Sequence, residues 1–224
     1  MSAFAPPDDF AAAAFAKWTK TPGADSEVYL VYGGATGWLG GLLVTLLKDS
    51  GKTVHIGEAR LENREAILRD FEKFKPTRVL NAAGVTGRPN VDWCEDNKQT
   101  VIRTNIIGTL NLADICWNKE IHCTLYATGC IFEYDTAHPI GGPGFTEEDR
   151  ANFDGSFYSK PMGFLEAMLR SHNTTLTLRA RMPTSATPEP SGGSFVAPGR
   201  SVSAASPFRP VAPGSCETGR AIFG

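Results

Sequence analysis

The chain has 224 residues, 42% of them hydrophobic and 21% charged, which is the composition of a folded globular protein and excludes disorder throughout. Its 22 Lys and Arg residues are balanced by 24 Asp and Glu residues, and the formal net charge of −2 argues against a nucleic-acid partner. No apolar run reaches the roughly 18 to 20 residues that span a bilayer, and no Cys or His pair has zinc-ligand spacing, so we predict no membrane partner and no metal site.

Residues 1–26 are predicted to form a flexible leader. They contain Pro6, Pro7, the acidic pair Asp8 and Asp9, and a run of alanines. A transit peptide is the alternative, but such peptides are rich in Arg and poor in acidic residues, and this stretch has no Arg. A leader with one short helix therefore fits the composition better.

From residue 28 onward, short apolar runs alternate with segments of helical periodicity. The short runs predict buried parallel strands, and apolar residues spaced three and four apart predict helices. The predicted strands are 28–32, 53–56, 78–84 with its exit, 122–127 and 175–181. Four helices are predicted. The first has an inner face of Leu39, Leu42, Leu43, Leu46 and Leu47. The second begins at the cap residue Asn63 and has an inner face of Ile67, Phe71 and Phe74, and the other two cover 100–117 and 158–172.

Strand–helix units that repeat in this way close as a parallel sheet covered on both faces, because right-handed crossovers place a helix over each pair of strands. We therefore predict an α/β fold, a doubly wound parallel sheet of the Rossmann type. This NAD(P)-binding domain should cover residues 27–183.

Residues 184–224 are predicted to be a disordered tail. The segment is dominated by Ser, Pro, Gly and Ala and shows no apolar period. It cannot bury enough apolar surface to offset the entropy cost of ordering it.

The five cysteines are odd in number and scattered along the chain, which is typical of a reducing compartment and not of a disulfide framework. A cytoplasmic location is therefore expected. These residues are Cys94, Cys116, Cys123, Cys130 and Cys216.

A glycine-rich turn follows the first predicted strand. Gly34, Gly37 and Gly40 form a G-x-x-G-x-x-G motif between a strand and a helix. Gly34 would permit the tight turn, Gly37 the close approach of backbone to a pyrophosphate, and Gly40 the close packing of the helix on the sheet. The helix N-terminus would attract phosphate. The motif predicts dinucleotide binding, and a glycine-rich turn without a ligand is the alternative.

The residues leave the identity of the dinucleotide open. Glu58, at the end of the second strand, could bind a ribose 2′-hydroxyl and favour NAD(H), whereas Arg60 could bind the 2′-phosphate of NADP(H). Both residues could also be solvated charges at the entry to a helix.

Five strings together resemble one family. They are GATGWLGG (34–41), NAAGVTGRPNVDWCE (81–95), TNIIGT (104–109), YATGCIFEYD (126–135) and GSFYSK (155–160). Over about residues 28–183 the chain is similar to the plant nucleotide-rhamnose synthase/epimerase-reductases, which are extended short-chain dehydrogenase/reductases. The resemblance implies 3,5-epimerisation of UDP-4-keto-6-deoxy-glucose and NADPH-dependent reduction of its 4-ketone to UDP-rhamnose.

The resemblance also implies a cofactor site. NADP(H) is the implied cofactor, with NAD(H) as the alternative. The implied cofactor-binding residues are Gly34, Gly37, Trp38, Leu39, Gly40, Arg60, Ala82, Ala83, Gly84, Asn105 and Tyr158. The small residues 82–84, at the end of a strand, would let the cofactor lie across the sheet at its switch point.

The resemblance further implies three catalytic residues. Thr128 would bind the substrate carbonyl, and Tyr158 would donate a proton as hydride arrives at carbon 4. Cys130 is a candidate for the acid–base pair that epimerisation requires, although free cysteines are more often small buried hydrophobes. Val85, Arg88 and Asn90 would bind the sugar nucleotide, and a loop Arg is as often a plain surface charge.

The catalytic tyrosine of this family belongs to Y-x-x-x-K, but here Met162 stands where the lysine should be. Residues i and i+4 share one helix face, so an ammonium there would lie near the tyrosine. At about 4 Å it would favour the ionised phenol by roughly 4 kcal/mol, around three pH units. Lys160 is about 200° around the helix, so we expect Tyr158, Met162, Leu165 and Leu169 to form an apolar stripe.

The resemblance stops at Arg181-Met182-Pro183, so we expect the small C-terminal substrate subdomain to be missing from this chain. Two hypotheses follow. The chain is an epimerase/reductase that is impaired as written, supplied with substrate by a separate 4,6-dehydratase; or it is an NADP-binding pseudoenzyme that partners such a dehydratase. The family resemblance also implies a homodimer.

Overall fold

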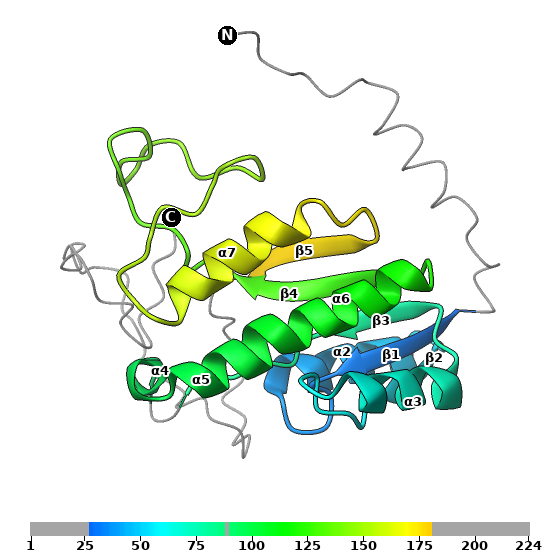
Figure 1. Cartoon of the computed structure of the whole chain (residues 1–224). Helices are drawn as coiled ribbons and strands as arrows, with labels where there is room; N and C mark the ends of the chain where they lie inside the picture. Colours follow the sequence, from blue (N-terminus) through cyan, green and yellow to red (C-terminus); the bar gives the residue numbers. More distant parts are fainter. Residues whose placement is uncertain (1–26, 88–89, 181–224) are drawn as a thin grey trace, which may run out of the picture.

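A computed structural model describes residues 27–87 and 90–180 of the chain. The predicted leader (1–26), Arg88 and the predicted tail (184–224) lie outside the described residues. The described chain forms one sheet of five parallel strands in the order β2-β1-β3-β4-β5 (Figure 1). The strands are β1 (Val28–Tyr32), β2 (Thr53–Ile56), β3 (Arg78–Asn81), β4 (His122–Thr128) and β5 (Thr175–Ala180).

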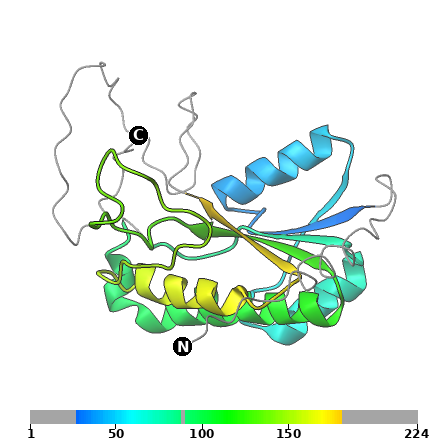
Figure 2. The same ribbon diagram turned by 90° about the horizontal axis from the view of Figure 1, so that it is seen from above.

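Helices cover both faces of the sheet. Figure 2 shows α2 (Trp38–Asp49) on one face and α3 (Arg64–Phe74), α6 (Gly108–Asn118) and α7 (Ser159–Leu169) on the other. This arrangement confirms the predicted doubly wound α/β fold. Among the described helices, none is long and apolar enough to cross a bilayer.

The core on the three-helix face has two parts. The first packs α3 and α6 on β1 and β3 and contains Leu30, Ile67 and Leu112, all fully buried. The second packs α7 and α6 on β4 and contains Leu125 and Leu165. The inner face predicted for α3 is therefore confirmed, as is its cap, because Asn63 Oδ1 accepts the N–H of Ala66 at 3.0 Å.

The inner face predicted for α2 is partly wrong. Leu42 and Leu46 are 47% and 63% exposed, whereas Gly40 and Val44 are the buried residues of this helix. A glycine at position 40 lets the helix backbone approach the strand closely, and that contact turns Gly40 and Val44 toward the sheet. Apolar spacing alone could not reveal this rotation.

The helix predicted over 100–117 begins at Lys98 and is interrupted. It consists of α5 (Lys98–Val101), a π-helical segment η2 (Ile102–Ile107) and α6, preceded by the short α4 (Trp93–Asp96). A π-helical turn holds one residue more than an α-helical turn, and such segments occur often at functional sites.

The half-buried imidazole of His122 predicts a pH-dependent stability. Burial, together with the nearby positive charge of Arg78, lowers the pKa of His122 from 6.5 to about 4. The unfolded chain therefore binds a proton between these values and the folded chain does not, so the free energy of unfolding should fall as pH drops from 6.5 toward 4. The slope for one proton is about 1.4 kcal/mol per pH unit.

Urea unfolding of the wild type and of His122→Gln at about pH 7 and about pH 5 measures this contribution. We expect the wild type to lose more stability than the variant on acidification, because the variant lacks the titrating group. Parallel loss in both proteins would contradict the prediction.

Candidate functional site

The candidate site lies at the carboxyl edge of the sheet, between β1 and β3. β2 lies on one side of β1, and β3 lies on the other side. The strand order therefore reverses between β1 and β3, which makes this position the topological switch point of the sheet. Ligands of open parallel sheets bind outside the carboxyl ends of the strands at such switch points. The glycine turn leaves β1 here, and residues 82–85 leave β3.

The tight turn after β1 depends on Gly33, which the G-x-x-G-x-x-G pattern does not single out. Gly33 has a φ of +82°, and a Cβ built on it would lie 2.7 Å from the carbonyl carbon of Ala82 and 2.8 Å from the nitrogen of Ala83. Gly33 is thus the residue in the left-handed conformation. The prediction that Gly34 permits the tight turn is wrong. Gly34 is instead packed against Val44, whose Cγ2 would lie 2.9 Å from an added Cβ.

Gly37 and Gly40 allow α2 to begin directly beside this turn. A Cβ on Gly40 would overlap the carbonyl of Gly33 and lie 2.8 Å from the nitrogen of Gly34. A Cβ on Gly37 would lie 2.6 Å from the Gly33 oxygen, which accepts the Gly37 N–H at 3.1 Å. Trp38 and Leu39 form the first turn of α2, which contains no acidic residue. The helix terminus at this edge can therefore attract an anion.

Two buried asparagines fix the loop that leaves β3. Asn105, which is 3% exposed and lies in η2, accepts the N–H of Val85 and donates to its carbonyl, both at 2.8 Å. Asn81, which is 1% exposed, accepts the N–H of Ala83 at 3.0 Å. Asn105, predicted as a cofactor-binding residue, thus holds the backbone of the loop after β3, whereas Asn81 was not predicted.

Thr128 and Cys130 lie at the same edge, at the end of β4. Thr128 Oγ1 accepts the N–H of Cys130 at 3.0 Å, and the Thr128 side chain is 8% exposed. The Cys130 side chain is half-buried. Tyr158 immediately precedes α7 and packs against the cluster that contains Ile131 and Met162. The structure thus brings the three predicted catalytic residues to one end of the sheet.

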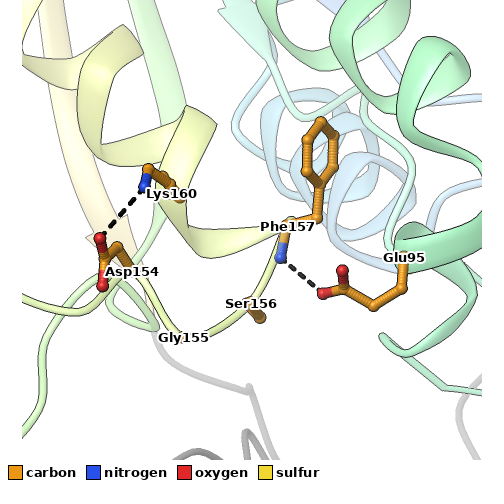
Figure 3. Close-up of a pocket in the computed structure, with 6 residues that line it drawn as sticks. All are labelled: Glu95, Asp154, Gly155, Ser156, Phe157 and Lys160. Carbon is orange, nitrogen blue, oxygen red and sulfur yellow. Dashed lines mark hydrogen bonds and ion pairs between the residues drawn. The ribbon is translucent and has the colours of Figure 1, made fainter.

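Met162 and Lys160 lie as the helix geometry predicts. Met162 is 8% exposed and shares a buried cluster with Leu165 and Leu169, with Tyr158 packed against it, so the predicted apolar stripe is confirmed. The Lys160 ammonium is turned toward Asp154 at 3.2 Å (Figure 3). Lys160 therefore pairs with the preceding loop.

The predicted substrate-binding residues that the structure describes, Val85 and Asn90, form hydrogen bonds within the protein. Asn90 bonds to its own neighbour, because its Nδ2 donates to Asp92 at 2.9 Å and its Oδ1 accepts the N–H of Asp92 at 3.1 Å. Arg88 lies outside the described residues. Val85 is fixed by Asn105, and Arg60 is exposed on the turn after β2.

Glu95 links the predicted substrate loop to the tyrosine segment, and sequence analysis assigned it no role. Its carboxylate accepts the N–H of Phe157 at 2.6 Å, across 62 positions of sequence (Figure 3). The Lys98 ammonium lies 5.1 Å from the Phe157 ring and 4.0 Å from Glu95. A surface hollow of about 230 Å³ opens beside this contact. Residues of α4 and α5 therefore fix the position of Phe157, which directly precedes Tyr158.

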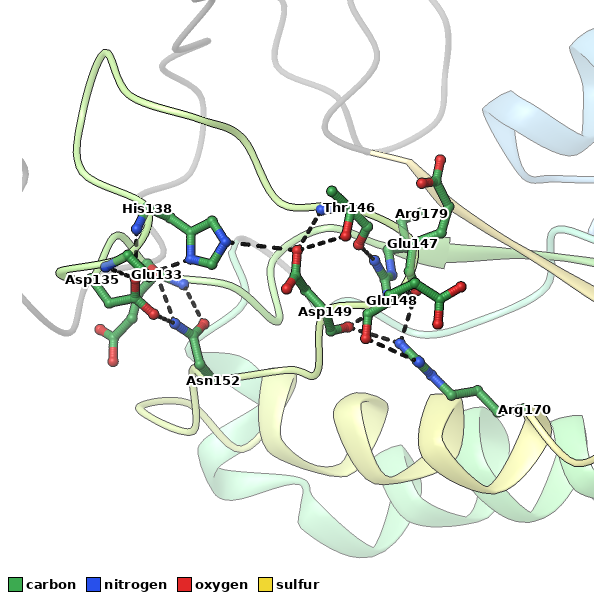
Figure 4. Close-up of polar contacts among 11 residues, drawn as sticks. Glu133, Asp135, His138, Thr146, Glu147, Glu148, Asp149, Asn152, Arg170 and Arg179 are labelled. Carbon is green, nitrogen blue, oxygen red and sulfur yellow. Dashed lines mark hydrogen bonds and ion pairs between the residues drawn. The ribbon is translucent and has the colours of Figure 1, made fainter. Parts of the chain in front are cut away.

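The long connection from Cys130 to Phe157 is ordered by two arginines (Figure 4). Arg179 forms an ion pair at 2.6 Å with Glu166, a carboxylate only 7% exposed, and hydrogen bonding to Glu166 raises the pKa of Arg179. Arg179 and Arg170 both donate to backbone carbonyls of the loop. The acceptors are those of Thr146, Glu147 and Asp149 for Arg179, and Glu147, Glu148 and Asp149 for Arg170.

The two ends of this connection meet at Ile131. The N–H groups of Asn152 and Phe153 both donate to the Ile131 carbonyl, at 3.2 and 3.1 Å. This connection thus holds the residue after Cys130 against the segment before Tyr158. In the part of the chain that the structure describes, no group of three His, Cys, Asp or Glu residues is placed to hold a metal ion.

Comparisons with known proteins agree on one group. The family described as RmlD substrate binding domain matches residues 28–180. The chain is 56% identical over 158 residues to the bifunctional dTDP-4-dehydrorhamnose 3,5-epimerase/dTDP-4-dehydrorhamnose reductase of Arabidopsis thaliana, covering 70% of this chain and 52% of that protein.

A trifunctional UDP-glucose 4,6-dehydratase/UDP-4-keto-6-deoxy-D-glucose 3,5-epimerase/UDP-4-keto-L-rhamnose-reductase of the same plant is 54% identical over 158 residues, covering 70% of this chain and 24% of its own length. Among solved structures, the L780 UDP-rhamnose synthase of Acanthamoeba polyphaga mimivirus aligns with a TM-score of 0.65 at 34% identity, covering 70% of this chain and 56% of that chain. The chain thus spans about half the length of the bifunctional relative and of this viral enzyme, and about a quarter of the trifunctional one.

Substitution of Asn105 tests how the β3 loop is held. Asn105→Ala would leave the N–H and the carbonyl of Val85 without their partner, and we expect the free energy of unfolding to fall by about 1–3 kcal/mol. Asn118→Ala is the matched control, since Asn118 lies on the same continuous helix but is exposed and bonds only to the Asp114 carbonyl. Urea denaturation of both variants that gave equal losses would contradict this role of Asn105.

Proposed function

The chain belongs to the RmlD substrate binding domain family, and on that basis we propose that it acts as a nucleotide-sugar 3,5-epimerase/4-keto-reductase, making UDP-rhamnose from UDP-4-keto-6-deoxy-glucose with NADPH. The observation that carries the proposal is that the glycine turn, Thr128, Cys130 and Tyr158 all lie at the carboxyl edge of one parallel sheet. The names of the plant relatives and of the viral enzyme support this choice of substrate.

The residues at the switch point fit a dinucleotide. The turn has no room for a Cβ at Gly33, Gly37 or Gly40, so backbone and a helix terminus, not side chains, form the floor on which a diphosphate would lie. Gly34, Trp38 and Leu39 would complete this floor, and Arg60 would hold the 2′-phosphate. The small residues 82–84 would let the cofactor lie across the sheet, and Asn105 fixes Val85 directly after them. When bound, NADPH supplies the hydride for carbon 4.

Thr128 and Tyr158 would act on the substrate oxygen. The Thr128 hydroxyl, oriented by the N–H of Cys130, would bind the ketone, and the Tyr158 hydroxyl would donate its proton to the same oxygen as that oxygen becomes negative. The Cys130 thiol would serve as one member of the acid–base pair that moves protons beside the ketone during epimerisation. Val85, Arg88 and Asn90 would contact the sugar nucleotide.

Met162 supports a second function, that of an NADP-binding pseudoenzyme or a partner subunit of a dehydratase. A buried methionine supplies no charge to the neighbouring phenol, whereas the glycine turn that would bind the diphosphate does not include position 162. In either case a 4,6-dehydratase must supply the keto-sugar, an activity that the trifunctional relatives carry within the same protein according to their names. We place the protein in the cytoplasm as a homodimer.

Cofactor binding is the first test of this proposal. NADPH should bind to the purified chain and change its fluorescence. Gly40→Ala should weaken binding at least about tenfold, because the added methyl overlaps the Gly33 carbonyl. Gly144→Ala is the control, since a Cβ there meets nothing within 4 Å. A folded wild type that gives no response to NADPH would refute dinucleotide binding.

Met162→Lys separates the enzyme from the pseudoenzyme. If the chain is a reductase, this lysine should raise the rate of NADPH oxidation with the keto-sugar, because an ammonium beside Tyr158 favours the ionised phenol by roughly 4 kcal/mol. It should also lower the melting temperature, since position 162 is buried. Met168→Lys, on the exposed face of α7, should change neither. A rate that does not rise in the folded Met162→Lys protein would favour the pseudoenzyme.

A further inference from the structure

We propose that Lys73 is a specificity-determining residue, which holds the Glu58 carboxylate back along α3 so that the turn after β2 presents Arg60 to a nucleotide 2′-phosphate. The inference rests on the proposed dinucleotide binding and names the device that would select NADP(H) over NAD(H). Lys73 lies 15 positions after Glu58, outside the motifs that indicated the cofactor.

The backbone of the turn after β2 is fixed from two sides. Asp70, which is 4% exposed, accepts the N–H groups of Glu58 and Ala59, both at 2.9 Å, and the hydroxyl of Tyr32 at 3.1 Å, all on Oδ2. Burial and the neighbouring Asp70 raise the pKa of Tyr32, which therefore keeps its proton for this bond. Because Tyr32 is the last residue of β1, the turn is tied to the strand that carries the glycine turn.

The side chain of Glu58 is held by an ion pair. Its Oε1 lies 2.6 Å from the Lys73 ammonium. Lys73 lies 4.8 Å from the Phe74 ring, and Phe74 in turn stacks on His55 of β2 with ring centroids 4.7 Å apart. The last turn of α3, which contains Lys73, therefore lies beside β2, before the turn that carries Glu58. The pair draws the carboxylate away from the carboxyl edge of the sheet, where the glycine turn lies.

Arg60 provides the remaining charge of this turn. Its side chain is exposed, and it forms no hydrogen bond or ion pair with the described residues, while its carbonyl accepts the N–H of Asn63 at 2.9 Å. Within residues 57–60, where Glu58 is paired with Lys73, Arg60 is the charged side chain that forms no ion pair with the described residues. A guanidinium binds a phosphate in bidentate geometry, whereas a free carboxylate would repel it and accept the ribose hydroxyls instead.

The experiment uses adenosine fragments, which report on this end of the site without catalysis. Calorimetry would measure 2′,5′-ADP and 5′-AMP binding to the wild type, Lys73→Gln, Glu58→Gln and the double variant. The wild type should prefer 2′,5′-ADP. Lys73→Gln should weaken 2′,5′-ADP binding about two- to fivefold, the range expected for an exposed ion pair, and should strengthen 5′-AMP binding. In the double variant, which has no carboxylate to release, 2′,5′-ADP binding should recover.

Lys75→Gln is the matched control. It removes the same charge from the residue that caps α3, and Lys75 forms no ion pair with Glu58. It should leave the preference unchanged. Equal effects of Lys73→Gln and Lys75→Gln, or no recovery in the double variant, would overturn the role of Lys73 while leaving dinucleotide binding intact. A folded wild type that binds neither fragment nor NADPH would overturn the proposed function itself, and this inference with it.

Discussion

The contact between the start of α2 and the end of β1 is the constraint on which the rest of the structure depends. Peptide groups of the strand exit and the helix meet where a Cβ at Gly40 would overlap the carbonyl of Gly33. This contact decides which face of α2 meets the sheet, and it leaves Leu42 and Leu46 exposed. It also brings a helix N-terminus to the switch point of the sheet, where an anion can be bound by backbone alone. The backbone that leaves β3, at Ala82 and Ala83, also lies close to Gly33, where a Cβ would overlap it.

Around that contact, buried polar side chains hold loop backbones in place. Asn105 fixes Val85 after β3, Asp70 fixes residues 58 and 59 after β2, and Thr128 fixes Cys130 after β4. Each of these side chains forms hydrogen bonds to main-chain N–H or carbonyl groups, which would otherwise be costly to bury. The carboxyl edge therefore has a preformed shape made by α3, η2 and β4. The two arginines on Glu166 do the same for the loop that runs between Cys130 and Tyr158.

Much of this architecture follows from local sequence. The five strands, the cap at Asn63, the glycine turn and the stripe of Met162, Leu165 and Leu169 were all predictable, because each depends on residues close in sequence. The rotation of α2, the positive φ of Gly33 and the π-helical segment were not, because they depend on how one backbone packs on another. The roles of Asn81, Asp70 and Glu95 were not predictable either. Asp70 and Glu95 bond to residues distant in sequence, and the bond from Asn81 to Ala83 depends on the conformation of the turn. The ion pair of Lys73 with Glu58 and the packing of Lys73 on Phe74 were also not predictable, because no sequence spacing indicates these contacts.

The π-helical segment at 102–107 has a consequence for how this region can vary. Its wide turn accommodates one more residue than the flanking α-helix, and Asn105 reaches Val85 from within it. Loss of a single codon there would let the segment relax to an ordinary α-helix while α5 and α6 keep their register. Asn105 would then shift relative to the loop after β3, and its hydrogen bonds to Val85 would be lost although α6 stayed in the core. The extra residue thus serves the loop after β3 and not the packing of the helix.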